Sequence, residues 1–147
     1  MKHKATSALL FVAGLTLAAC SPPAANSTPT QPPLTIEETD GSELSRLRLS
    51  ASAVARLGIE TVAVGVKNVG GVSRSVIPYA ALIYDAEGST WAYTNPEGLV
   101  YTRAEVTVER IDGEDAILTD GPAAGTFVVT VGGAELWGAE HGVGGGH

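Results

Sequence analysis

Short β-branched and aromatic runs, cut at regular intervals by glycine-containing turns, fill the segment Val76–Gly138. Each run is long enough for one strand and each turn can reverse the chain, which is typical of a small antiparallel β domain. No apolar pattern of helical period and useful length interrupts the segment. The sequence therefore predicts an all-β fold, a mainly antiparallel small barrel or sandwich, over residues 34–138, with one short helix.

The sequence predicts the position of one β-hairpin. Asp112-Gly113 favours a two-residue turn because glycine adopts positive φ without strain, so Glu105–Ile111 is expected to pair with Ala116–Thr119. The alternation of apolar and polar residues slips by one near Arg110, which indicates a β-bulge or a strand end there.

The predicted helix spans Ala51–Leu57. Ser50 precedes it, and a serine hydroxyl can accept hydrogen bonds from the free N–H groups of the first turn. Gly58 is placed to end the helix in the left-handed conformation. Beyond it, the alternation over Ile59–Val69 predicts a strand, and Gly70-Gly71 then marks a turn or a seam.

The start of the chain has the pattern of a secretory leader. Lys2 and Lys4 precede the apolar run Leu9–Leu17, which is shorter than the about 20 apolar residues of a membrane-spanning helix. Residues 1–19 are therefore predicted to be a signal peptide. Leu17-Ala18-Ala19-Cys20 resembles the bacterial lipobox, in which the cysteine is acylated, and Cys20 is the only cysteine in the chain. An ordinary secretory leader is the alternative.

The segment that follows Cys20 predicts a tether. Ser21–Pro33 contains five prolines among small polar residues and cannot bury enough apolar surface to fold. Residues 20–33 are thus expected to be a lipidated cysteine and a disordered linker that holds the domain at a membrane in the bacterial cell envelope, facing the periplasm. Ser21, in place of an aspartate, slightly favours the outer membrane over the inner one.

The charge of the chain excludes one class of partner. After Lys2 and Lys4 leave with the leader, seven basic and sixteen acidic side chains remain, a net charge of −9. Nucleic acid is not expected as a partner, because phosphate binding needs a basic patch. Arg103 and Arg110 are expected to pair with Glu105 and Glu109 on solvated strand faces.

Three blocks of sequence together resemble the periplasmic adaptor subunits, or membrane fusion proteins of the HlyD-like kind, that serve RND-type efflux pumps. The first block is Leu49–Thr61, the second comprises Val76–Tyr84 and Trp91–Tyr93, and the third is Val106–Leu136. The first resembles an early segment of these adaptors, and the other two resemble their C-terminal, membrane-proximal β domain.

The resemblance also implies what this chain lacks. A full adaptor places a lipoyl-like domain, an α-helical hairpin and most of a β-barrel between the first two blocks, whereas about 15 residues separate Thr61 from Val76 here. The chain is therefore expected to be a free-standing membrane-proximal module that binds an RND pump or a full-length adaptor by protein–protein contact. A vestigial remnant of an adaptor is the alternative.

The glycine-rich end of the chain offers a second function. Glu140, His141 and His147 lie in residues 139–147, which are expected to form a flexible tail, and they could offer two imidazoles and a carboxylate to Cu or Zn. A periplasmic metal-binding accessory protein is therefore the alternative to a docking module, although the loose spacing gives no preformed geometry.

No catalytic residues are predicted. The chain has no Gly-x-Ser-x-Gly elbow, and no nucleophile, base and orienting group can be assembled from it, so an enzyme is not expected. Trp91 is expected to pack across strands with neighbouring tyrosines, and Trp137 is the better candidate for a partner contact.

Overall fold

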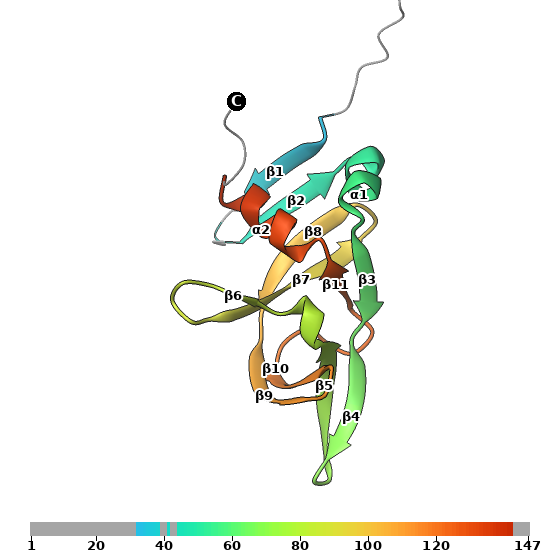
Figure 1. The fold of residues 1–147 in the computed structure, drawn as a ribbon, viewed down its shortest axis with the longest axis vertical. Coiled ribbons are helices and arrows are strands. Elements are labelled where there is room, and N and C mark those ends of the chain that lie inside the picture. The colour runs from blue at the N-terminus through green and yellow to red at the C-terminus, as the bar shows by residue number, and fades with distance from the viewer. Residues whose placement is uncertain (1–31, 39–40, 42–43, 143–147) are drawn as a thin grey trace, which may run out of the picture. The chain divides into compact units, whose positions relative to one another are not determined.

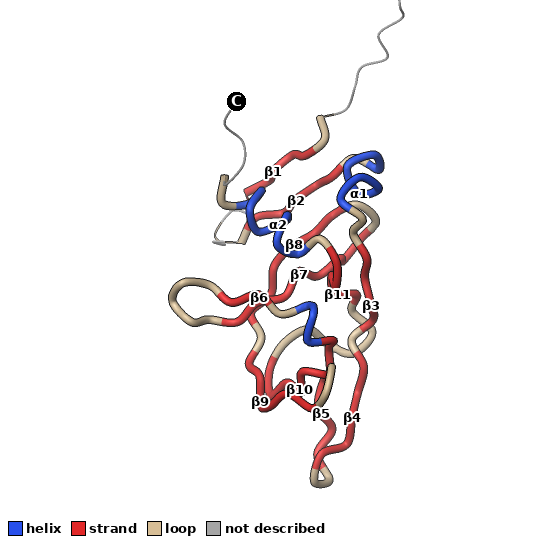
Figure 2. Tube along the Cα trace, in the orientation of Figure 1, coloured by secondary structure: helices blue, strands red, loops and turns tan. Residues whose placement is uncertain are grey.

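The computed structural model describes residues 32–38, 41 and 44–142, and the fold of this part is all-β, as predicted (Figure 1). The predicted signal peptide, Cys20, nearly all of the tether and His147 lie outside the described residues. Figure 2 shows that strands predominate over the short helices, of which two are α-helices. These helices are α1 (Ala51–Leu57) and α2 (Gly133–Glu140), and a 3₁₀ turn, η1, covers Tyr79–Ala81.

The strands form two antiparallel sheets. The larger sheet has the order β1-β2-β8-β7-β11-β3, with β6 paired to β7, and the smaller has the order β4-β5-β10-β9. The larger contains β1 (Leu34–Glu38), β2 (Ser45–Leu49), β3 (Glu60–Ala63), β6 (Ile83–Tyr84), β7 (Thr90–Glu97), β8 (Val100–Glu105) and β11 (Phe127–Val131). The smaller contains β4 (Gly65–Val69), β5 (Val72–Pro78), β9 (Thr107–Asp112) and β10 (Asp115–Asp120).

Two central strands of the larger sheet separate two apolar cores. Successive side chains of a strand point to opposite faces, so Ala92 of β7 and Val128 of β11 enter one core while Tyr93 and Val129 enter the other. The first core lies between the two sheets and includes Val64, Ile77, Ala81, Val106, Ala116 and Leu118. The second lies between the larger sheet and the helices and includes Leu47, Leu49, Ala53, Tyr101 and Leu136.

The caps of α1 are confirmed. The Ser50 hydroxyl accepts a hydrogen bond from the backbone N–H of Ala53 at 3.2 Å. Gly58 ends the helix at φ 61° and ψ 36°, the left-handed conformation that glycine adopts without steric cost.

The predicted hairpin and its bulge are also confirmed. Strand β9 pairs with β10, and two consecutive residues of β10 are opposite Arg110 and Val108, so Glu109 between them is the extra residue of a bulge. The turn lies one residue later than predicted, because Asp112 still belongs to β9 and pairs with Asp115.

The single strand predicted over Ile59–Val69 is wrong. The chain passes from the larger sheet to the smaller at Val64, which is buried in the first core. Its N–H donates to the carbonyl of Thr126 at 2.8 Å, and its carbonyl accepts from the N–H of Gly125 at 2.9 Å. These bonds fix the break between β3 and β4, and they depend on a loop more than 60 residues away in the sequence.

The predictions of one short helix and of a loose tail from residue 139 are corrected by α2. This second helix continues to Glu140, and the N–H of His141 still bonds to the carbonyl of Trp137 at 3.1 Å. Leu136 is buried in the second core and Trp137 packs against it. Packing of one helical face onto the sheet therefore outweighs the low helix propensity of Gly138.

The smaller sheet is strongly curved. Its edge strands β4 and β9 are not neighbours in the strand order, yet Lys67 Nζ lies 2.8 Å from Asp112 Oδ2. Arg74 of β5 likewise reaches Glu109 of β9, with 2.7 Å between Nε and Oε2. The hydrogen bond from Lys67 lowers the pKa of Asp112 below its usual value.

Among the described glycines, Gly132 has the least room for an added Cβ. It precedes α2 at φ 91°, and a Cβ there would lie 2.7 Å from Ile59 Cγ1. We expect Gly132→Ala to lower the free energy of unfolding by about 2–4 kcal/mol, through left-handed strain and overpacking. Gly125→Ala is the matched control, because Gly125 has φ 85° and open space. Equal losses in urea unfolding would contradict the predicted close approach.

Candidate functional site

Two tryptophans and an arginine meet beside α2. The Arg103 guanidinium of β8 lies 4.6 Å from the centre of the Trp91 ring of β7 and 5.4 Å from that of Trp137. Both distances are within the range of cation–π attraction. We refer to Trp91, Arg103 and Trp137, together with Glu140 and His141, as the tryptophan cluster.

Glu140 holds the cluster to the larger sheet. Its side chain is only 4% exposed, and its Oε1 lies 3.1 Å from Arg103 Nε. The Arg103 Nε–H is not aligned for a hydrogen bond, so this contact is an ion pair. The second oxygen, Oε2, accepts a hydrogen bond from the Tyr93 hydroxyl at 2.5 Å. A buried carboxylate needs such partners, since burying an unpaired charge is costly.

The Tyr93 hydroxyl donates this hydrogen bond from inside the second core. Burial raises the pKa of its phenol above the usual range, and the neighbouring Glu140 carboxylate raises it further. The phenol therefore stays protonated across the physiological range and remains a hydrogen-bond donor.

Trp91 is fixed from the other side by a turn. Its indole Nε1 donates to Asp85 Oδ2 at 2.9 Å, while Asp85 Oδ1 accepts from the backbone N–H groups of Glu87 and Ser89. The hydrogen bond from Trp91 is the main cause of a lowered Asp85 pKa. The loop between β6 and β7 thus orients the tryptophan ring.

His141 covers Trp137. The two rings stack with centroids 4.1 Å apart and an interplanar angle of 25°. His141 Nδ1 also lies 2.9 Å from the carbonyl oxygen of Trp137. His141 is exposed to solvent, whereas both tryptophans are half-buried.

The structure thus places most of the predicted site residues together, though not in the predicted way. The expected pairing of Arg103 with Glu105 is wrong, because the arginine turns to Glu140, while Arg110 pairs with Glu109 at 3.0 Å as predicted. Sequence spacing could not show this, since the carboxylate comes from a segment that was expected to be loose.

The predicted metal ligands are only partly described. Both Glu140 oxygens have protein partners, His141 stacks on Trp137, and His147 lies outside the described residues. Among the described residues, no group of three or more His, Cys, Asp or Glu side chains could hold a metal ion.

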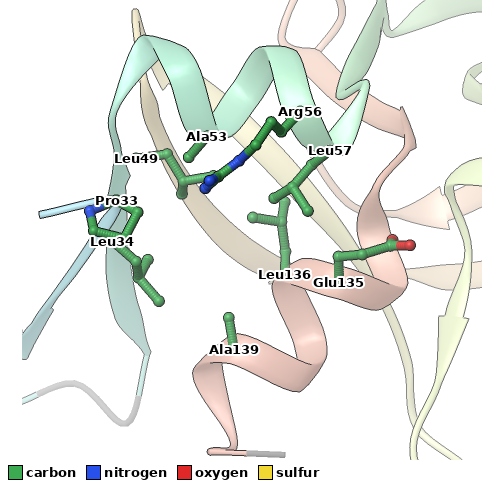
Figure 3. A pocket seen from close by; sticks show the side chains of 9 residues that line it. All are labelled: Pro33, Leu34, Leu49, Ala53, Arg56, Leu57, Glu135, Leu136 and Ala139. Atoms are coloured by element: carbon green, nitrogen blue, oxygen red, sulfur yellow. The ribbon is translucent and has the colours of Figure 1, made fainter. Parts of the chain in front are cut away.

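A second feature, missed by sequence reasoning, is an apolar groove between α1 and α2 with a volume of about 120 Å³ (Figure 3). It is formed by segments far apart in the sequence, so no local pattern indicates it. Its lining residues are Pro33, Leu34, Leu49, Ala53, Arg56, Leu57, Glu135, Leu136 and Ala139.

Within the part of the chain that the structure describes, neither α-helix is long and apolar enough to cross a membrane.

The chain is similar to a 180-residue piece of SilB from Cupriavidus metallidurans CH34, solved by NMR, that encompasses the N-terminal metal-binding site and the membrane-proximal domain. The two are 27% identical, with a TM-score of 0.45, and the match covers 57% of this chain and 48% of that chain. This chain therefore spans about half the length of the SilB piece. No protein-family model and no curated protein matches the chain.

The Tyr93 hydroxyl gives a pH-dependent test of the cluster. A phenol whose pKa is raised on folding stabilises the protein fully below the unfolded pKa of about 10, and this contribution is lost as pH rises further. We expect Tyr93→Phe to cost about 1–3 kcal/mol at pH 7, because Glu140 loses a donor, and to reduce the loss of stability above pH 10. Urea unfolding at pH 7 to 11 measures both. An unchanged alkaline slope would contradict the burial of this phenol.

Proposed function

We propose that this chain is a non-catalytic interaction module of a transmembrane efflux assembly, held at the membrane through a lipidated Cys20. Its partner is an RND pump or a full-length adaptor, and it faces the periplasm, with the outer membrane favoured. The support comes from the way in which the three adaptor-like blocks fit together in the fold.

The observation that carries the proposal is the pairing of β3 with β11. Thr61, at the end of the first block, lies opposite Val129 of the third. The second block joins the same sheet, because Thr94, one residue beyond it on β7, lies opposite Val128. Parts of all three adaptor-like blocks are therefore joined in one hydrogen-bonded sheet.

The hairpin β4–β5 takes the place of those intervening domains. Val69 is opposite Val72, and Gly70 and Gly71 between them have φ 60° and 85°, so the chain reverses in a two-residue turn. The bond between Lys67 and Asp112 ties this hairpin to β9. This closed and tied connection is our support for a working module over a vestigial remnant.

The tryptophan cluster is the partner contact that we propose. Trp and Arg are enriched among the residues that dominate binding energy at interfaces. Here Asp85 and Glu140 hold Trp91 and Arg103 before any partner arrives, which lowers the entropic cost of binding. His141 extends this surface toward solvent.

A metal-binding accessory role remains the second candidate, and the geometry favours it less. Glu140 is committed to Arg103 and Tyr93, so a metal ion would have to break a buried ion pair to use it. His141 and His147 alone would provide two ligands, fewer than a stable Zn site requires.

Photocrosslinking in cells tests the docking proposal. A photoreactive amino acid replaces His141 in the tagged full chain, and the matched control places it at Val66 of β4, which is 61% exposed. We expect adducts with an RND pump or an adaptor from position 141, identified by mass spectrometry, and none from position 66. Adducts with no transport component from either position, in a chain shown to be lipidated, would contradict the proposal.

Removal of residues 143–147 separates the two candidate functions. The deletion removes His147 and leaves Glu140 and His141 in place. We expect the crosslinks from position 141 to persist, because the cluster is anchored in the β domain. Isothermal titration with Zn²⁺ or Cu²⁺ gives the complementary readout. If the full chain binds the metal tightly, and the deletion abolishes both this binding and the crosslinks, the metal-binding role is favoured instead.

A further inference from the structure

The groove between α1 and α2 is a mostly apolar feature that the proposed function leaves unused. The side chains of Leu57 and Leu136 point toward each other across it, and Leu34 and Leu49 from paired strands form its floor (Figure 3). Apart from Arg56 and Glu135, all of its lining side chains are apolar.

Exposed apolar side chains continue the groove outward. Leu57 is 39% exposed, and Ile36 of β1, two residues beyond Leu34 and on the same face, is 44% exposed. Leu99 is 37% exposed, and its backbone carbonyl accepts a hydrogen bond from the N–H of Leu49, a lining residue. Apolar side chains gathered around an apolar groove are typical of a docking surface.

The groove is lined by one basic and one acidic side chain, Arg56 and Glu135, and Arg56 is the one that lies next to Leu57 in the sequence. Every other Lys or Arg side chain among the described residues has a carboxylate within 4 Å. Arg56 is in none of these pairs, although the chain is acidic overall, and it lines the groove next to Leu57. A free guanidinium beside apolar side chains suits an anionic group attached to an apolar body.

The position of the groove along the chain indicates where that body would be. Pro33 and Leu34, among the first described residues, both line the groove. Cys20 lies 13 residues before Pro33, so an anchor there can be no more than about 45 Å from the groove along an extended chain. A lipid surface is therefore the apolar and anionic partner that this groove would encounter continuously.

We propose that the groove and its rim, Ile36, Leu57 and Leu99, form a contact surface for an anionic phospholipid bilayer. The apolar rim enters the boundary between headgroups and acyl chains, and Arg56 binds a headgroup phosphate. This inference rests on the lipid anchor of the proposed function but not on the efflux partner. In the proposed orientation, α1 and α2 face the bilayer. The β4–β5 hairpin, at the opposite end of the fold, points away from it (Figure 1).

A depth measurement on the full lipidated chain tests this surface. Acylation consumes the thiol of Cys20, so Leu57→Cys supplies a single free thiol for an environment-sensitive dye. The control is Val66→Cys, an exposed valine on the β4–β5 hairpin. Both proteins are reconstituted on vesicles of phosphatidylethanolamine and phosphatidylglycerol that carry a nitroxide-labelled lipid. Circular dichroism and thermal unfolding show that each variant is folded.

We expect quenching at position 57 to exceed that at position 66 by about threefold or more, because only the first label lies within the interface. Arg56→Gln in the Leu57→Cys background should reduce this quenching, as should vesicles without phosphatidylglycerol. Equal quenching at both positions would overturn the proposal. A label at position 57 that is quenched neither by iodide in solution nor by the nitroxide lipid would also overturn the proposal. In that case a protein, such as a second copy of the chain, would cover the groove.

Flotation of the same vesicles distinguishes a failure of the anchor from a failure of the groove. A chain that does not float with vesicles disproves the lipid anchor, and with it this inference. A chain that floats while positions 57 and 66 are quenched alike retains its anchor and lacks the proposed contact. Neither result depends on the efflux partner.

Discussion

The antiparallel pairing of β3 with β11 is the constraint on which the rest of this structure depends. It joins Glu60–Ala63 to Phe127–Val131, segments more than 60 residues apart, and the two cores lie on either side of β11 through Val128 and Val129. Closing so long a loop costs conformational entropy, which the buried valines offset. Within this loop, the β4–β5 hairpin reverses the chain in two residues and so leads it directly from β3 into the smaller sheet.

Polar interactions also hold helix α2 in place. Helix α2 is short, and its sequence includes Gly133 and Gly138, so propensity alone would not stabilise it. Leu136 packs into the second core, while Glu140, at the end of the helix, forms an ion pair with Arg103 and accepts a hydrogen bond from Tyr93. The same bonds that secure α2 fix the tryptophan cluster, so the proposed partner contact and the stability of the domain depend on one set of residues. The opposite side of α2 forms a wall of the groove that we assign to lipid.

Features set by neighbouring residues could be predicted from the sequence. The Ser50 and Gly58 caps, the β9–β10 hairpin and its bulge each depend on local turn chemistry or alternation. The break at Val64 could not be predicted, because hydrogen bonds to Gly125 and Thr126 create it. Burial of Glu140 was missed for the same reason, since its partners lie on β7 and β8. The sequence showed both tryptophans, and only the fold showed that Arg103 lies between them.

Amide hydrogen exchange on the full chain tests the central claim, that the adaptor-like blocks close into one cooperative domain. If they do, the amides of β3 that bond to β11 exchange only through global unfolding, with the same free energy as the buried amides of β10 at Ala116 and Ile117. Much faster exchange in β3 and β11 than in β10 would mean that the first block is not held by the last. The chain would then be a β hairpin assembly with a loose N-terminal segment, and a closed adaptor-like module would be ruled out.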